Sequence, residues 1–384
     1  MLFLVTVAWA VAVFLERFKI PIIIGELIAG IIIGPSVLNL INPSQGIELL
    51  SSLGMFFLIF YAGLENEVGQ LKNTFKTSFW VGLIGTIVPF ILVYSTVIYF
   101  SGNQLQAFLV GLALAGTSMV TKSRIMSDLD IEKSQISHKM MGASIFDYLL
   151  IFISIAVVSK IVIQGYFTPV DGIVIFLELF LFIAIAVFLG IAIFPKFSKY
   201  FFAKHGKGFT FAMLLGFIFA VFAEMLHLPM ILGAYIAGLF VREKMMTPPL
   251  FQKMSDRFLA ISHGFLGPIF IMSIAFKINF NALPGNIWFF VILVMAAFLG
   301  KYFGVIIGGL ISSNSFAESK TMGIAMNSRG EIELVVATIG LQLGVLTNDH
   351  LSILVCVTFA TTIISAFFLS RLVFKQDSSL NITK

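Results

Sequence analysis

The sequence has few charges and almost no cysteine. Charged residues make up 11% of its 384 residues, whereas a soluble domain carries about 25%. The single cysteine, Cys356, lies in an apolar run, which excludes a disulfide framework and a cysteine-rich metal site. These shortages argue against a soluble enzyme, and we expect neither catalysis nor a resident cofactor.

Hydrophobic residues take the place of the missing charges. They make up 59% of the chain and recur in runs of roughly 20 residues, long enough to cross the hydrocarbon core of a bilayer. Backbone groups find no water at that depth, so the spans must be helices or a closed barrel. Barrel strands alternate apolar and polar residues, whereas these runs are apolar throughout. The sequence therefore predicts an all-α polytopic membrane protein embedded in the lipid bilayer.

Breaks at Pro, Gly, Asn and charge clusters divide the chain into about thirteen predicted transmembrane helices. They cover approximately residues 2–17, 21–41, 48–64, 77–100, 105–128, 136–164, 170–194, 207–226, 229–243, 255–276, 286–311, 320–345 and 350–374. With the N-terminus outside, nineteen of the 24 Lys and Arg residues fall in inside segments, two (Lys160 and Lys277) fall outside, and three lie within spans. This asymmetry predicts an external N-terminus and a cytoplasmic C-terminus in the inner (cytoplasmic) membrane. Because the basic residues set topology, we expect no nucleic-acid partner.

An internal repeat links the two halves of the chain. Residues 12–30 and 220–238 are identical at ten of nineteen positions at a fixed offset of 208, including an aligned Glu, Pro and Gly. The copies open on the first and eighth spans and so have opposite orientations in the membrane. Inverted repeats are typical of secondary transporters, although channels also use repeats. We expect one exchanger unit over 1–384, with a first repeat at 1–164 (spans 1–6), a linker span and cytoplasmic loop at 165–206, a second repeat at 207–374 (spans 8–13) and a short cytoplasmic tail at 375–384.

Two opposite charges lie near the middle of predicted spans. Asp147 lies roughly midway along the sixth span and Lys301 roughly midway along the eleventh. A charge at the centre of a bilayer is costly, so we expect these two residues to form an ion pair. One interpretation is a static bridge between two helices. The other is a functional pair that exchanges protons as a cation arrives.

The twelfth span carries the stretch "NSRGEIELVV" (327–336). Arg329, Glu331 and Glu333 flank Gly330 there in an apolar context. Charges of both signs around a glycine predict a helix that is interrupted where it lines a polar cavity, with these three residues as accessory charges.

The repeat pairs this stretch with "LAGTSMVTK" (114–122) in the fifth span. Thr117 and Ser118 follow Gly116 and are predicted to expose hydroxyl and carbonyl oxygens at a second helix break. The alternative is ordinary hydrogen bonding of both hydroxyls to the preceding turn. Glu26, early in the second span, is interpreted as a paired helix-end residue, with an ion ligand as the alternative.

Seven motifs give the chain a specific resemblance to a known family. They are "PIIIGELIAGIIIGPSVL" (21–38), "FFLIFYAGLENEV" (56–68), "GTSMVTKSRIMSDL" (116–129), "GASIFDYLL" (142–150), "LPMILGAYIAGLFV" (228–241), "GPIFIMSIAFKINF" (267–280) and "MNSRGEIELVVATIGLQLGV" (326–345). The chain resembles the membrane domain of the monovalent cation:proton antiporter-2 family of bacterial sodium or potassium/proton exchangers. The resemblance implies the sodium/proton antiporter fold with crossed discontinuous helices, alternating access and a homodimer. It also implies that Thr117 and Ser118 lie at the break and that Asp147, with Lys301 near it, faces the cavity for the monovalent cation.

One departure from the family pattern bears on function. The family's sixth-span motif usually ends in two acidic residues, or in Asn or Gln then Asp, and the second position generally binds the cation. Here Asp147 matches the first position and Tyr148, a phenol that stays neutral at neutral pH, fills the second. The leading hypothesis is an antiporter for Na⁺ or K⁺ in which Asp147, paired with Lys301, carries the exchangeable charge. Thr117, Ser118 and Tyr148 would donate oxygen ligands. The alternative is a family member without classical antiport: a channel-like pathway, a carrier of another substrate or a membrane sensor.

Overall fold

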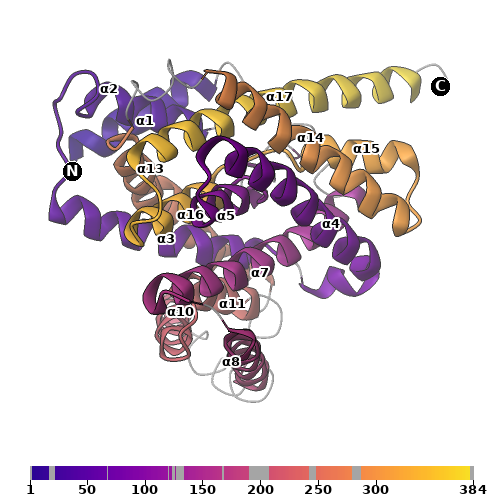
Figure 1. The fold of residues 1–384 in the computed structure, drawn as a ribbon, viewed down its shortest axis with the longest axis horizontal. Coiled ribbons are helices and arrows are strands. Elements are labelled where there is room, and N and C mark those ends of the chain that lie inside the picture. The colour runs from indigo at the N-terminus through magenta and orange to yellow at the C-terminus, as the bar shows by residue number, and fades with distance from the viewer. Residues whose placement is uncertain are drawn as a thin grey trace. The chain divides into compact units, whose positions relative to one another are not determined.

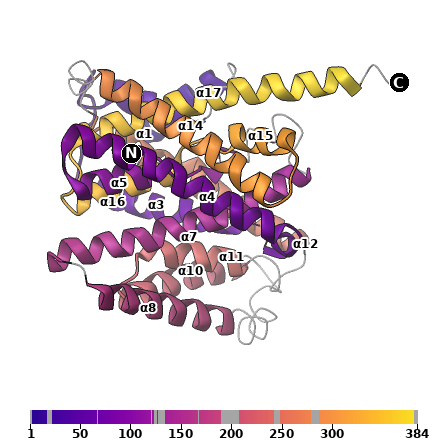
Figure 2. The same cartoon turned by 45° about the vertical axis from the view of Figure 1, so that its right-hand side comes forward.

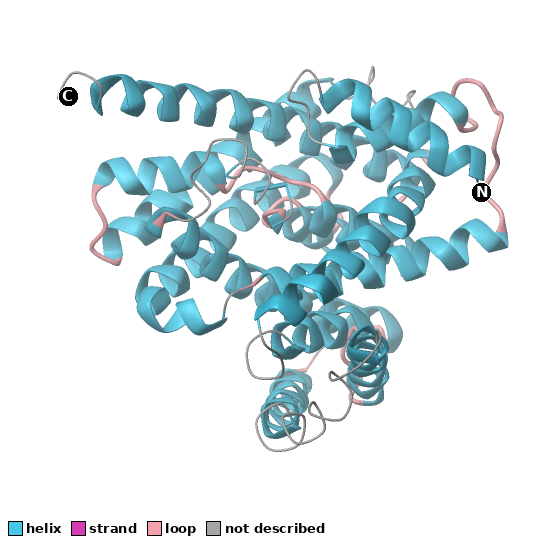
Figure 3. Ribbon diagram, turned by 180° about the vertical axis from the view of Figure 1, so that it is seen from behind, coloured by secondary structure: helices cyan, strands magenta, loops and turns pink. Residues whose placement is uncertain are grey.

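A computed structural model describes residues 2–16, 22–66, 68–119, 121–122, 126, 134–166, 168–189, 207–241, 248–278 and 287–380. Every regular element within these ranges is a helix, coloured cyan in Figure 3. Eight of the described helices are long and apolar enough to cross a membrane, and two shorter apolar helices accompany them. The predicted all-helical fold is confirmed, while the count of thirteen spans stays a prediction.

The chain forms two compact units, each built from two separate stretches of sequence. Figure 1 labels the helices of both units. Unit 1 comprises Met1–Gly69 and Phe152–Phe276, and unit 2 comprises Gln70–Ile151 and Lys277–Lys384. The helices of unit 1 are α1 (Leu2–Glu16), α2 (Ile22–Ile33), α3 (Gln45–Glu65), α8 (Pro169–Phe188), α10 (Lys207–Met225), α11 (Met230–Val241), α12 (Pro248–Ile261) and α13 (Gly267–Ala275), the last two joined by a π-helical turn at Ser262–Leu266. Those of unit 2 are α5 (Gln104–Ala113), α14 (Ile287–Ile311), α15 (Phe316–Ala325), α16 (Glu331–Gln342) and α17 (Asn348–Leu380). Helices α4 (Val68–Ser101) and α7 (Gln135–Gln164) contain residues of both units.

Each unit combines stretches from both predicted repeats. The repeats therefore do not coincide with the compact units, and they remain a prediction from the sequence. Residues 190–206 of the predicted linker and cytoplasmic loop, and residues 381–384 of the predicted tail, lie outside the described residues.

Helices α3 and α11 approach each other closely in unit 1. A Cβ on Gly63 would lie 2.3 Å from the backbone oxygen of Tyr235, and one on Gly238 would lie 2.2 Å from that of Phe60. Helices within a membrane gain little hydrophobic stabilisation from each other, so small residues that admit close backbone contact stabilise their packing. Both glycines therefore hold this helix pair together.

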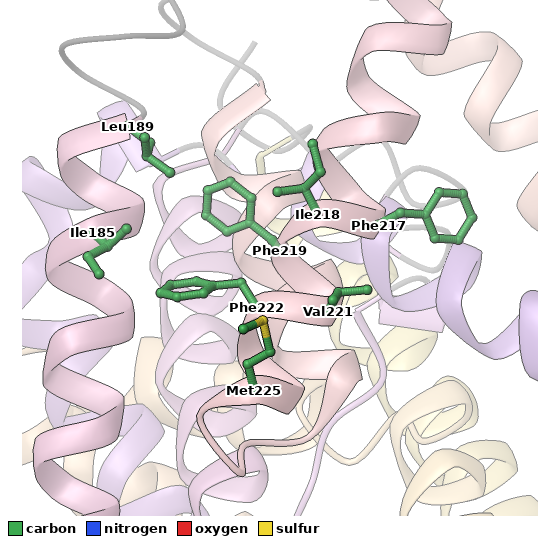
Figure 4. Close-up of a pocket in the computed structure, with 8 residues that line it drawn as sticks. All are labelled: Ile185, Leu189, Phe217, Ile218, Phe219, Val221, Phe222 and Met225. Carbon is green, nitrogen blue, oxygen red and sulfur yellow. The ribbon is translucent and has the colours of Figure 1, made fainter.

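Helix α8 lies beside α10 in unit 1 (Figure 2), and an apolar pocket lies between them (Figure 4). Its lining consists of Ile185, Leu189, Phe217, Ile218, Phe219, Val221, Phe222 and Met225. None of these side chains carries an oxygen or nitrogen, so the pocket offers no side-chain ligand to an ion.

In unit 2, three glycines spaced four residues apart bring α14 against α4. They are Gly300, Gly304 and Gly308. A Cβ on Gly300 would lie 2.6 Å from the Cα of Pro89, and one on Gly308 would lie 2.5 Å from the backbone oxygen of Trp80. This spacing places all three glycines on one helix face. The close approach brings the residue after Gly300, a lysine, next to the polar groups of α4.

Candidate ion-binding site

Both predicted helix breaks are present in unit 2. The fifth span is interrupted between α5 and Met119, where helical backbone resumes, and the twelfth is interrupted between α15 and α16. The two unwound segments contact each other: the N–H of Ser118 donates to the carbonyl of Ser328 at 3.0 Å. The hydroxyl of Thr117 donates to the carbonyl of Met326 at 3.0 Å. The alternative, in which these hydroxyls bond to the preceding turn, is therefore wrong for Thr117.

The structure brings Asp147 and Lys301 together with no solvent exposure of either side chain. The Lys301 ammonium lies 2.8 Å from Asp147 Oδ2 and donates a second hydrogen bond, also 2.8 Å, to the carbonyl of Ala115. The other carboxylate oxygen, Oδ1, accepts a 2.5 Å hydrogen bond from the hydroxyl of Thr86. Desolvating a pair of charges is costly unless further hydrogen bonds satisfy them, and here both partners have such bonds.

Sequence reasoning missed Thr86. This residue lies in α4, three residues before Pro89, and one of many hydroxyls in an apolar chain gives no signal by itself. A signal does exist on the partner helix, where the four-residue glycine spacing around Lys301 predicts a closely packed helix. That spacing identifies a tight contact but does not say which helix makes it.

A second buried carboxylate, Glu331, collects hydrogen bonds from three donors. Its Oε1 accepts from the hydroxyl of Tyr148 at 2.8 Å and from the N–H of Met119 at 2.7 Å. Its Oε2 accepts a short hydrogen bond from the hydroxyl of Ser118. Glu331 and Tyr148 have no solvent exposure. The structure thus connects the predicted site residues Ser118 and Tyr148 through a glutamate that sequence reasoning had treated as accessory.

Arg329 and Glu333 hold the backbone around the two breaks. The guanidinium of Arg329 donates to the carbonyls of Gly116 at 3.3 Å and Ala297 at 3.1 Å. The Glu333 carboxylate accepts from the N–H of Gly330 at 2.7 Å and lies 3.8 Å from the Arg329 guanidinium. Both side chains are buried. These contacts fit the predicted accessory role, which remains a prediction.

The buried charges follow the polarity of the interrupted helices. Lys301 and Arg329 donate to the carbonyls of residues 115 and 116, just after α5 ends, where the helix dipole is negative. Glu331 accepts the N–H of Met119, where helical backbone resumes, and Glu333 accepts an N–H at the start of α16. Unwound backbone in a membrane is tolerated where such groups are satisfied. The breaks and the charges therefore stabilise each other.

The buried charges in the described part of unit 2 sum to zero. Lys122, a third buried cation, donates to the carbonyl of Met140 at 3.0 Å and to the hydroxyl of Ser144. The positive residues are Lys122, Lys301 and Arg329, and the negative ones are Asp147, Glu331 and Glu333. A neutral set is the arrangement that a low-dielectric interior favours.

Glu26 belongs to unit 1, where it is buried in α2. Among the described residues its carboxylate has no ion pair or hydrogen bond, and Arg17 and Lys19, the basic residues that precede it in the sequence, lie outside the described ranges. Its interpretation as a paired helix-end residue stays a prediction.

Comparison with known proteins identifies the family of the chain. The sequence model of the family described as "Sodium/hydrogen exchanger, transmembrane" matches residues 2–375, almost the whole chain. This chain belongs to the sodium/hydrogen exchanger family. Membership makes it a multi-pass membrane protein of a transporter family, as the resemblance implied.

Curated relatives of this exchanger are named as antiporters. The Na(+)/H(+)-K(+) antiporter GerN of Bacillus cereus is 29% identical to it, covering 96% of this chain and 94% of its own. The probable Na(+)/H(+) antiporter GerT of the same species is 31% identical, covering 88% of this chain and 89% of its own. The solved structure of the sodium proton antiporter MjNhaP1 from Methanocaldococcus jannaschii matches this exchanger with a TM-score of 0.75 at 18% identity, covering 97% of this chain and 96% of that one. The exchanger therefore has the sodium/proton antiporter fold.

Proposed function

We propose that this exchanger carries a monovalent cation, Na⁺ or K⁺, in exchange for protons by alternating access, with Asp147 as the exchange carboxylate. The proposal rests mainly on the position of the Lys301 ammonium. This monovalent cation is held without solvent exposure between Asp147 Oδ2 and the carbonyl oxygen of Ala115. A desolvated cation needs oxygen ligands and a compensating negative charge, and this position offers both. The antiporter names of the relatives support the same cargo.

Competition at one carboxylate couples the two fluxes. An incoming cation displaces the Lys301 ammonium from Asp147 and takes over its oxygen ligands. The hydroxyl oxygens of Thr86, Thr117 and Ser118 complete the ligand shell. A proton on Asp147 removes the negative charge that the cation needs, so proton and cation cannot bind it together, and alternation between them gives exchange.

We further propose that the protein acts as a homodimer in the inner (cytoplasmic) membrane, with its N-terminus outside and its C-terminus in the cytoplasm. The asymmetry of Lys and Arg supports the orientation, and the family resemblance supports the dimer. Helices α2 and α11 end at Ile33 and Val241, positions that differ by the repeat offset of 208, which supports the internal repeat.

The test is collapse of a pH gradient in everted membrane vesicles on addition of Na⁺, K⁺ or Li⁺. We expect the wild-type protein to dissipate the pH gradient with at least one of these cations. Asp147→Asn, expressed at the same level, is expected to dissipate it with none of them. If wild type and Asp147→Asn respond identically, Asp147 is not the exchange carboxylate.

A second function is favoured by one observation: Tyr148 stands where the family resemblance leads us to expect the cation-binding acid. On this alternative the protein is a channel-like pathway, a carrier of another substrate or a membrane sensor. The discriminating variant is Tyr148→Asp. If it creates cation/proton exchange that wild type lacks, the alternative holds; if wild type already exchanges, it fails.

A further inference from the structure

The hydrogen bonds of Tyr148 lead to a second carboxylate at the broken helices. We propose that Glu331 is a second cation-binding carboxylate of the exchange site and that Tyr148 is a positioning residue that holds it there. The inference rests on the proposed exchange function, because it names a further ligand for the same cargo.

The surroundings of Glu331 supply oxygen atoms of the kind that hard cations prefer. Its carboxylate lies fully buried where three segments meet: the start of α16, the break in the fifth span, and α7. The Tyr148 hydroxyl is 2.8 Å from Oε1, and the Ser118 hydroxyl bonds Oε2. Each hydroxyl can rotate its hydrogen away and turn a lone pair inward. One carboxylate and two hydroxyls then form an oxygen ligand set for a cation.

A single broken segment connects this carboxylate to the Asp147–Lys301 pair. Lys301 donates to the carbonyl of residue 115 and Glu331 accepts the N–H of residue 119, so both contacts fall within five consecutive residues. Asp147 and Tyr148 are also consecutive on α7. The two carboxylates therefore lie in neighbouring hydrogen-bond networks that share the broken segment at residues 115–119.

Charge balance gives Glu331 a task in the cation-bound state. A cation that displaces Lys301 from Asp147 adds a positive charge to a buried set whose formal sum is already zero. An uncompensated charge in this environment is costly. Glu331, one of the three negative charges already in that set, offers the cation a second carboxylate once the ammonium has left Asp147.

A purely structural role for Glu331 makes a different prediction. In that case the carboxylate only satisfies the donors at the break, and its loss lowers stability without changing the affinity for the cation. The measurement must therefore separate cation affinity from the amount of folded protein.

The experiment uses the purified full chain in proteoliposomes, with exchange measured against Na⁺, K⁺ and Li⁺ concentration. Glu331→Gln is expected to raise the apparent KM for the cation at least tenfold, and Tyr148→Phe, which removes one hydrogen bond to the carboxylate, to raise it about tenfold. Glu331→Asp keeps the charge and is expected to retain part of the affinity. The matched controls are Glu318→Gln, a partly exposed residue of α15 that pairs with Lys139, and Tyr302→Phe, in α14; both are expected to keep the wild-type KM.

A second measurement avoids turnover. In detergent, saturating Na⁺ or K⁺ is expected to raise the unfolding temperature of wild type, because a ligand bound only by the folded state stabilises it. The cation-dependent shift is expected to disappear in Glu331→Gln and to persist in Glu318→Gln. This readout applies even when a variant no longer transports.

Relocating the charge sharpens the test. In Glu331→Gln combined with Tyr148→Asp, the carboxylate is placed on α7, at the position whose side chain bonds Glu331 in wild type. This double variant is expected to have an apparent KM for the cation that is at least tenfold lower than that of Glu331→Gln alone.

The outcomes separate this inference from the proposed function. If wild type exchanges, Asp147→Asn is silent and Glu331→Gln keeps the wild-type KM and thermal shift, the role of Glu331 is overturned and the exchange function stands. A lower maximal rate at unchanged KM, or a double variant no better than Glu331→Gln, also overturns it. If wild type exchanges no cation, the proposed function itself fails.

Discussion

Asp147 and Tyr148 are consecutive residues of α7, yet their side chains enter different hydrogen-bond networks. Asp147 bonds Lys301 and Thr86, whereas Tyr148 bonds Glu331. Successive residues on an α-helix point about 100° apart, so two neighbouring side chains on one turn of α7 can reach Lys301 and Glu331 in different directions. A substitution at one position therefore reaches only one network directly, and this allows the two to be tested separately.

Thr86 is expected to contribute to cation affinity through Asp147. Thr86→Val keeps the shape and removes the 2.5 Å hydrogen bond to Oδ1. A hydrogen bond to a charged group contributes about 1.5–3 kcal/mol, so we expect kcat/KM for the cation to fall about tenfold or more. Thr86→Ser keeps the hydroxyl and is expected to stay within a few-fold of wild type.

The control lies on the same helix. The hydroxyl of Thr96 donates to the carbonyl of Leu92 one turn earlier, and Thr96→Val is expected to exchange like wild type. Equal kcat/KM values for Thr86→Val and Thr96→Val would remove Thr86 from the site.

The sequence predicted the helical fold because each span carries its own evidence. Length, apolarity and breaks are local properties, so the observed helices overlap the predicted ranges, although α2 ends eight residues before its predicted span does and α4 begins nine residues before its span. The breaks at residues 114–118 and 326–330 were also predictable, because glycine, hydroxyls and charges within a span conflict with continuous apolar helix.

The partners of the polar groups were predictable only where chemistry left one choice. Asp147 and Lys301 carry opposite charges at mid-span, and each has few other oppositely charged residues at that depth with which it could pair. The partner of Tyr148 lies 183 residues away in the chain, and a neutral hydroxyl accepts many partners. Sequence reasoning therefore identified Tyr148 as an anomaly but could not find Glu331 as its acceptor, which follows only from how α7, α16 and the break meet.

Lys301 and Asp147 are expected to be coupled in stability. Lys301→Met leaves the Asp147 carboxylate buried without its cation, and removal of one partner of such a pair costs about 3–5 kcal/mol. Combining Lys301→Met with Asp147→Asn removes the stranded charge, so the double variant is expected to be more stable than Lys301→Met alone. Unfolding of purified protein in detergent measures this double-mutant cycle.

Lys76 provides the comparison for that cycle. Its ammonium lies at the surface of α4, 3.5 Å from the Ser313 hydroxyl, and Lys76→Met is expected to change the free energy of unfolding by less than about 0.5 kcal/mol. Strictly additive effects of Lys301→Met and Asp147→Asn would show that the pair does not interact as its geometry indicates.

The glycine contact between α14 and α4 is expected to be necessary for the site. A Cβ at Gly300 would lie 2.6 Å from the Cα of Pro89, a backbone atom that cannot move aside alone. Gly300→Ala should therefore displace α14, lower stability by about 1–3 kcal/mol and reduce exchange, because Lys301 is the next residue. Gly46→Ala, where nothing lies within 4 Å of the added Cβ, is the control and is expected to be neutral or slightly stabilising. A Gly300→Ala protein with wild-type stability and exchange would contradict the close approach.

Competition at Asp147 gives the exchanger a definite pH dependence. Each unit decrease in pH raises the proton concentration tenfold, and where the proton competes with the cation we expect the apparent KM for the cation to rise by up to about tenfold. Saturating cation displaces the proton, so the maximal rate on the side of cation binding is expected to change far less than KM. Where the proton concentration is too low to compete with the cation, KM should become independent of pH. Proteoliposomes with pH set independently on the two faces measure both parameters. A constant KM with a maximal rate that falls as the pH is lowered would show that proton and cation bind at different groups, which is incompatible with exchange at Asp147 alone.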